Sequence, residues 1–201
     1  MDGENLRLAV LVNGLPGAGK STLAAGLSQH LGLPLLSKDV IKEIHADVLG
    51  SSPNSGHQRA WNAALGTAAS RTMWALLATA PAGAVVESSW RADVRDLAAD
   101  GLRQSPHLTA VEIWCDVPAD VARKRMENRH PRHPIHGELP SDAEWENWAT
   151  LGRPLALGPV LRVDTTRPVA WEPVLTWIRS HATPQLEGDP SPANERRDGN
   201  S

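Results

Sequence analysis

One eight-residue stretch constrains this chain more than any other. Residues 14–21 read Gly-Leu-Pro-Gly-Ala-Gly-Lys-Ser and match the pattern G-x-x-x-x-G-K-[ST]. A continuous apolar run at residues 7–13 precedes the match, and residues 20–31 carry apolar side chains at helical spacing after it. A strand, a glycine loop and a helix in this order predict backbone N–H groups that close around phosphate. The alternative, a plain glycine turn with a surface lysine, fits the flanking elements less well.

The same alternation continues along the chain. Further strands are predicted at residues 33–37, 84–87, 109–115 and 160–164. Further helices are predicted at residues 39–49, 59–79, 92–102, 119–129 and 170–181. Strands that alternate with helices favour an α/β fold with a parallel sheet and helices on both faces.

The length of 201 residues suits one domain, which we place at residues 1–182. Residues 183–201 contain almost no apolar side chains, so we expect a disordered C-terminal tail. No apolar run approaches the length of a membrane span, and the first residues are acidic and polar, unlike a signal peptide. We therefore expect a cytoplasmic protein without membrane contact.

Composition excludes some kinds of partner and chemistry. With 20 Lys and Arg against 23 Asp and Glu, the net charge of −3 provides no global field that attracts nucleic acid, so nucleic acid is not an expected partner. Eight Trp and no Phe or Tyr leave no phenol for catalysis. The single cysteine, Cys115, lies in an apolar run and is expected to fill the core.

The glycine motif itself supplies most of the candidate cofactor site. Lys20 would reach the β- and γ-phosphates of ATP, and the Ser21 hydroxyl would bind Mg²⁺. The candidate nucleotide-binding residues in this segment are Gly14, Pro16, Gly17, Ala18, Gly19, Lys20, Ser21 and Thr22.

Five segments together resemble a known family. They read NGLPGAGKST, SKDVIKE, VVESSWR, PADVARKRMENR and VDTT. In these segments the chain is similar to the small P-loop kinases, which include chloramphenicol phosphotransferases, zeta-toxin-like kinases and the kinase domain of polynucleotide kinase. The resemblance covers residues 7–181 and implies a three-layer P-loop fold whose five parallel strands have the order 2-3-1-4-5. It also implies an ATP- and Mg²⁺-dependent transfer of phosphate to a hydroxyl group.

Asp39 follows the second predicted strand, at the edge where open α/β sheets bind ligands. The resemblance implies that its carboxylate accepts the proton of the substrate hydroxyl. Alternatively, Ser37 or Asp39 only caps the next helix. Lys42, one turn later, either binds substrate or is a solvated lysine.

The third predicted strand ends in a second group of candidates. The resemblance implies that Glu87 orients Mg²⁺ or its water. Trp90 could stack on the substrate and Arg91 could pair with an anionic group, although simple packing and surface charge explain them equally well.

A basic segment follows the fourth predicted strand. The resemblance implies a lid at residues 123–143 that closes over ATP, with Arg125 and Arg129 as a catalytic pair at i, i+4 spacing. It also places Thr165 in the adenine-binding loop. A solvated helix face is the alternative for the arginines. The histidines at 130, 133 and 136 have no partner cysteine, which disfavours zinc.

The leading functional hypothesis is a phosphotransferase that acts on a hydroxyl of a small molecule, with an antibiotic suggested by the resemblance. Sugar, nucleoside and polynucleotide kinases remain alternatives, as does a nucleotide-dependent switch protein without an acceptor. The sequence indicates neither the acceptor nor the oligomeric state, and residues 45–62 and 88–95, which we expect to line the acceptor pocket, show no diagnostic pattern.

Overall fold

A computed structural model describes residues 7–182 except 55, 106, 131 and 132. The five strands are β1 (Arg7–Asn13), β2 (Leu35–Ser37), β3 (Gly83–Glu87), β4 (Leu108–Asp116) and β5 (Val160–Asp164). All neighbours are parallel and the sheet order is β2-β3-β1-β4-β5, which confirms the expected topology. The tail expected to be disordered, residues 183–201, lies outside the described residues, as do residues 131 and 132 of the expected lid.

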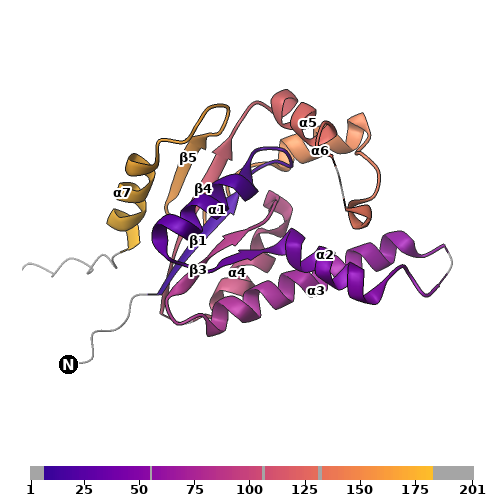
Figure 1. The fold of residues 1–201 in the computed structure, drawn as a ribbon, viewed down its shortest axis with the longest axis horizontal. Coiled ribbons are helices and arrows are strands. Elements are labelled where there is room, and N and C mark those ends of the chain that lie inside the picture. Colours follow the sequence, from indigo (N-terminus) through magenta and orange to yellow (C-terminus); the bar gives the residue numbers. More distant parts are fainter. Residues whose placement is uncertain (1–6, 55, 106, 131–132, 183–201) are drawn as a thin grey trace, which may run out of the picture.

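The described helices are α1 (Lys20–Leu31), α2 (Lys38–Leu49), α3 (Gln58–Thr79), α4 (Arg95–Arg103), α5 (Ala119–Glu127), α6 (Asp142–Leu151) and α7 (Trp171–Ala182). Figure 1 shows α1 and α7 on one side of the sheet and α3 and α4 on the other. The three layers follow from the alternation in the sequence, because each crossover helix must cover one face of the parallel sheet.

Each face of the sheet carries its own core. Val10 and Val12 of β1 pack with residues of α1 and α7, whereas Ala9 and Leu11 pack with residues of α3 and α4. Alternate side chains of a strand point to opposite faces, so one continuous apolar run supplies both cores. Because all five strands are parallel, their carboxyl ends lie at one edge of the sheet, and the glycine loop after β1 lies at this edge.

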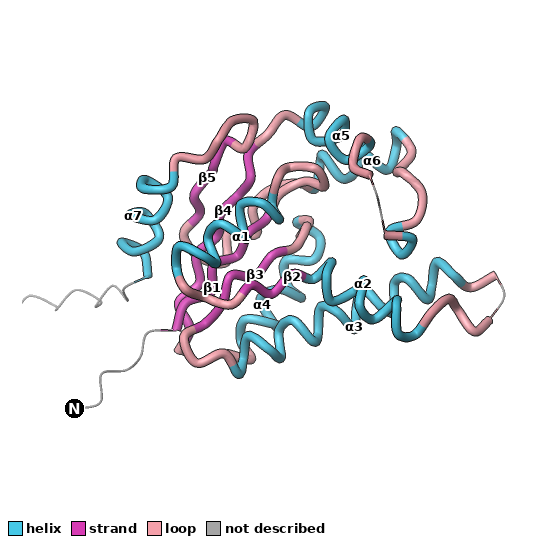
Figure 2. Tube along the Cα trace, in the orientation of Figure 1, coloured by secondary structure: helices cyan, strands magenta, loops and turns pink. Residues whose placement is uncertain are grey.

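Helices α2 and α3 form a hairpin that extends past the sheet (Figure 2). No residue of α2 is buried, and α3 buries only residues from Leu65 onwards. The hairpin therefore stands as a wall beside the carboxyl edge of the sheet.

The structure corrects the predicted helices in three places. Helix α6 is absent from the sequence prediction, although Ser141 and Glu144 form a capping box that begins it. The helix predicted at 119–129 ends at Glu127, two residues before Arg129, since helices rarely continue to a residue that precedes proline. The helix predicted at 92–102 is a 3-10 turn, Ala92–Val94, followed by α4.

No described helix is long and apolar enough to cross a membrane.

Candidate functional site

The glycine loop packs tightly between the sheet and helix α5. Gly17 and Gly19 have φ angles of 83° and 86°, a region that favours glycine. A Cβ atom on Gly17 would overlap the carbonyl of Ala122 in α5, so no larger residue fits there. The loop therefore presents its backbone to a ligand at the start of α1, where Ser21 and Thr22 are the second and third residues.

Lys20 is buried beneath this loop, with 6% of its surface exposed. Its Nζ donates a 2.9 Å hydrogen bond to the Leu15 carbonyl. Burial lowers the pKa of Lys20, while the carboxylates of Glu87 and Asp39 act in the opposite direction. A buried cation beneath a glycine loop at a helix N-terminus is the arrangement that a triphosphate requires.

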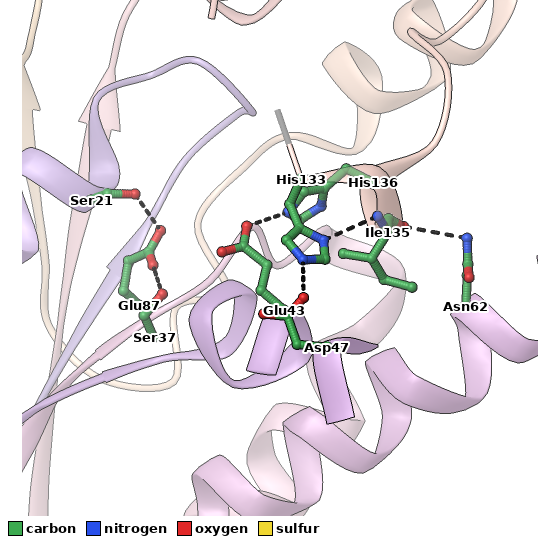
Figure 3. A network of polar contacts seen from close by, with 9 residues as sticks. All are labelled: Ser21, Ser37, Glu43, Asp47, Asn62, Glu87, His133, Ile135 and His136. Carbon is green, nitrogen blue, oxygen red and sulfur yellow. Dashed lines mark hydrogen bonds and ion pairs between the residues drawn. The ribbon is translucent and has the colours of Figure 1, made fainter. Parts of the chain in front are cut away.

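Glu87 lies at the end of β3 and is 2% exposed. Its carboxylate accepts a 2.5 Å hydrogen bond from Ser37 and a 3.4 Å hydrogen bond from Ser21 (Figure 3). Ser37 precedes α2 but makes no capping bond with its side chain, so its hydroxyl serves Glu87 instead of the helix. The structure thus brings together the two residues expected at Mg²⁺, and it adds Ser37 to them.

Asp39 occupies the first turn of α2 and is partly buried. No hydrogen bond to its carboxylate occurs within the described part of the chain. Burial lowers the pKa of both Lys20 and Lys42, and the negative charge of Asp39 opposes this shift in each lysine. Asp39 therefore belongs to the hairpin, lies within electrostatic range of Lys20 under the glycine loop, and makes no hydrogen bond through its carboxylate to the described residues.

Two buried polar residues behind the loop were missed by sequence reasoning. Asn13 and Glu112 are fully buried and joined by a 2.9 Å hydrogen bond. The Asn13 side-chain oxygen accepts from the backbone N–H groups of Gly14 and Trp90, and Glu112 accepts from those of residues 155 and 156. The signal in the sequence was Glu112, a charged residue inside the apolar run of β4. A buried carboxylate needs several hydrogen-bond donors, so such a residue indicates a buried polar network.

The predicted arginine pair does not share a helix face. Arg125 donates a 3.0 Å hydrogen bond to the Thr165 carbonyl, and the Thr165 hydroxyl donates a 2.6 Å bond to the Ala18 carbonyl. Arg129 lies beyond the end of α5 and is exposed, and its charge adds to the effect of burial in lowering the pKa of Lys20. Arg125 therefore links α5 to the loop expected to bind adenine, whereas Arg129 lies beyond the helix and within electrostatic range of Lys20.

Side-chain contacts join residues 133–136, in the segment after α5, to the hairpin. His136 contacts Glu43 at 2.7 Å and His133 contacts Asp47 at 3.0 Å, as Figure 3 shows. Asn62 of α3 donates a hydrogen bond to a carbonyl of the same segment. These histidines thus each contact a carboxylate of α2, and the described residues contain no cluster of three or more His, Cys, Asp or Glu able to hold a metal ion.

A cleft of about 880 Å³ opens between the loop and the hairpin. Its walls come from residues 14–16, the start of α2, α3 from residue 62 onwards, residues 89–104 and the end of α6. Of the expected wall at residues 88–95, Ser89, Trp90, Arg91 and Val94 line the cleft. Asn62 also lines it, whereas the other described residues of the expected wall at 45–62 do not, because the hairpin extends past the cleft.

Of the four predicted substrate residues, Lys42, Trp90 and Arg91 line this cleft, whereas Asp39 is not among the lining residues. Trp90 is 6% exposed and stacks on Trp74, with ring centroids 5.8 Å apart, so it forms part of the wall. Arg91 makes two hydrogen bonds to Asp93 and is already paired. Lys42 is half-buried and makes no hydrogen bond within the described residues.

Comparison with known proteins places this geometry in a family. Residues 10–152 match the family described as "AAA domain". The chain belongs to this family. The AAA domain defined by this match includes the glycine loop, Asp39, Glu87 and the basic segment. Comparison with curated proteins finds no match.

Solved structures share the fold of this AAA domain. A "putative kinase" from Chloroflexus aurantiacus J-10-fl is 31% identical, with a TM-score of 0.73, over 88% of this chain and 98% of that one. A sugar kinase from Janibacter sp. HTCC2649 is 21% identical, with a TM-score of 0.57, over 86% and 94%. A shikimate kinase from Acinetobacter baumannii is 17% identical, with a TM-score of 0.61, over 88% and 95%. The fold is that of the small P-loop kinases.

Proposed function

We propose that this protein is an ATP- and Mg²⁺-dependent kinase that transfers the γ-phosphate to a hydroxyl group of a small molecule. The observation that carries the proposal is the position of the cleft, whose lining includes Gly14, Leu15 and Pro16 of the glycine loop. A molecule in the cleft would lie beside the loop that is proposed to hold the triphosphate. Phosphoryl transfer mainly requires that the acceptor oxygen is held close to the γ-phosphorus.

Asp39 is the proposed general base. The acceptor hydroxyl oxygen attacks the γ-phosphorus, its proton passes to the Asp39 carboxylate, and ADP leaves. The charge of Asp39 acts on both Lys20, under the glycine loop, and Lys42, which lines the cleft, and this supports the role. The absence of a competing hydrogen bond within the described residues leaves both oxygens available.

Lys20 and Arg129 are the proposed cations at the transferring group. Lys20 is buried under the loop, and Arg129 is close enough to add to the lowering of the Lys20 pKa by burial. Charge spreads over the phosphoryl oxygens during transfer, and fixed cations stabilise it. Arg125 is held on Thr165 and is proposed to position the nucleotide-binding loop after β5.

The oxygens of Ser21 and Glu87 fit a Mg²⁺ ion bound mainly through nucleotide and water. Magnesium usually takes one or two protein oxygens and keeps several waters, and a serine beside a buried carboxylate meets that pattern. When bound, Mg²⁺ would neutralise charge on the β- and γ-oxygens. Glu87, also held by Ser37, is proposed to orient a magnesium-bound water.

Antibiotics, sugars and nucleosides are all candidate acceptors under this proposal. The test is a mass-spectrometric screen for the gain of one phosphate, with ATP and Mg²⁺, across antibiotics, sugars, hydroxy acids, nucleosides and oligonucleotides. A product with one added phosphate that requires Asp39 supports the proposal. ATP binding without transfer to any compound would favour a nucleotide-dependent switch instead.

A further inference from the structure

The cleft beside the glycine loop carries an excess of positive charge. Its lining contains four cationic side chains, Lys38, Lys42, Arg71 and Arg91, against the single carboxylate of Asp100. Two of these five charges already have partners outside the cleft. Arg91 is paired with Asp93, and Asp100 is paired with Arg103. Three cations therefore remain without an ion pair in the described part of the chain.

Two of these cations lie close together on α2. Lys38 and Lys42 are separated by one helical turn. Burial and the charge of Lys38 both lower the pKa of Lys42, against the opposing effect of Asp39. The Lys42 side chain runs against α3, where its Cε lies 3.9 Å from the position that a Cβ on Gly66 would occupy. Neighbouring like charges in a half-buried site cost free energy, which a bound anion would offset.

Arg71 is the third of these unpaired cations of the cleft and belongs to α3, the helix that packs against α2. The Arg71 side chain is exposed on α3. The residues expected to bind the nucleotide belong to other elements, namely the glycine loop, α5 and the loop after β5. The cleft-lining residues around it, Gly66, Thr67 and Ser70, have short side chains. Lys42 and Arg71 line the same cleft, and the short side chains leave the α3 surface accessible to a small molecule there.

We propose that the acceptor is a hydroxylated anion whose carboxylate or phosphate group is bound by Arg71 and Lys42. This inference rests on the proposed kinase function and narrows its acceptor class. Arginine binds planar or tetrahedral oxyanions through two parallel hydrogen bonds, and lysine adds a compact point charge. Trp90 and Trp148 line the same cleft, so the carbon skeleton packs against apolar surface. Asp39 is not a lining residue, but it follows the cleft-lining Lys38 on α2, and the acceptor hydroxyl must reach it from the cleft.

Matched pairs of compounds test the charge requirement. Quinate, shikimate and gluconate are compared with their methyl esters, and glucose 6-phosphate and ribose 5-phosphate with the free sugars. Esterification removes the anion and keeps the hydroxyl groups of the acid. We expect phosphorylation of at least one charged compound, with kcat/KM about 100-fold above that of its neutral partner. The acid and sugar-phosphate arms show which oxyanion is recognised.

Variants then test the two residues. Arg71→Gln and Lys42→Gln should each raise the KM for the charged acceptor by about 10–100-fold, the effect of losing a hydrogen bond to a charged group. The KM for ATP should stay within about twofold, and Arg71→Lys should recover part of the loss. Arg59→Gln is the matched control, because Arg59 is on the same helix as Arg71 but its side chain is 98% exposed and lies outside the cleft.

The possible failures are distinguishable. A neutral acceptor that is used as well as its charged partner, with no effect of Arg71→Gln, overturns the anionic acceptor and leaves the kinase proposal intact. Equal increases in the KM for ATP and for acceptor place the cations in the nucleotide site and also overturn the inference. ATP binding without phosphorylation of any compound of either charge overturns the kinase proposal and this inference with it.

Discussion

Ser37 and Glu87 are paired residues at the ends of neighbouring strands β2 and β3, and a 2.5 Å hydrogen bond joins their side chains. The Glu87 carboxylate also accepts from Ser21, the last residue of the phosphate-binding motif. Strand pairing thus delivers a buried carboxylate to the glycine loop from a distance of 66 residues along the chain. Because Glu87 is held beside Ser21 in this way, its substitution should change how the reaction rate depends on Mg²⁺.

Glu87→Gln should raise the Mg²⁺ concentration needed for half-maximal rate by about 10–100-fold, because residues that orient metal ligands have effects of this size. The amide keeps the size of the side chain and one acceptor oxygen, so the melting temperature should change little. Rates measured against Mg²⁺ at fixed ATP check this prediction. Glu146→Gln, an exposed position on α6, is the control. An unchanged Mg²⁺ dependence would restrict Glu87 to a structural role.

Asp39→Asn should lower kcat by about 10²–10⁴-fold and leave the Kd for ATP close to that of the wild type, since a positioned base contributes in this range. Stability should be nearly unchanged because the amide is the same size. Asp96→Asn is a matched control, as Asp96 is also an acidic residue in the first turn of a helix, α4. A normal kcat in the Asp39→Asn variant would remove this residue from the mechanism.

Lys20→Met should reduce kcat by at least about 10²-fold and weaken ATP binding, because it removes a preorganised cation at the phosphates. Methionine retains a long apolar stem in a position that is 6% exposed, so the fold should survive. Steady-state kinetics and isothermal titration with ATP measure both effects. Lys124→Met, at an exposed position of α5, should behave like the wild type. Wild-type turnover by the Lys20→Met variant would contradict the phosphate-binding assignment.

Glu112→Ala should destabilise the protein by about 3 kcal/mol or more, because it leaves several buried donors without an acceptor. Those donors are the Asn13 amide and the N–H groups of residues 155 and 156. Urea unfolding followed by tryptophan fluorescence gives the free energy of unfolding. Glu127→Ala, on the surface of α5, should cost much less. Equal losses for the two variants would show that the buried network contributes little.

Cys115 should resist thiol reagents in the folded protein. Burial raises the pKa of its thiol to about 12, so almost no thiolate exists at pH 8. Because the pKa of Cys115 is raised in the folded protein, its contribution to the free energy of unfolding is full below the ordinary cysteine pKa. This contribution is lost as the pH rises towards 12. Reaction with iodoacetamide should therefore require unfolding. Fast labelling of native protein at pH 8 would be incompatible with this environment.

Local pattern determined much of the fold and the core of the nucleotide site. The bounds of β1, α1 and β5 agree with those predicted from apolar runs, helical spacing and glycine positions. The strand order 2-3-1-4-5 came from the family resemblance and is confirmed. These features depend on residues close together in sequence or on motifs that occur in a fixed order.

Which distant side chains meet depends on how the helices and strands pack. The Asn13–Glu112 bond joins residues 99 positions apart, and Arg71 lines the cleft only because α3 returns beside α2. Arg125 and Arg129 match helical spacing in the sequence, yet α5 ends before the second of them. Sheet order, helix packing and helix termination set these positions, and each depends on contacts that sequence spacing does not encode.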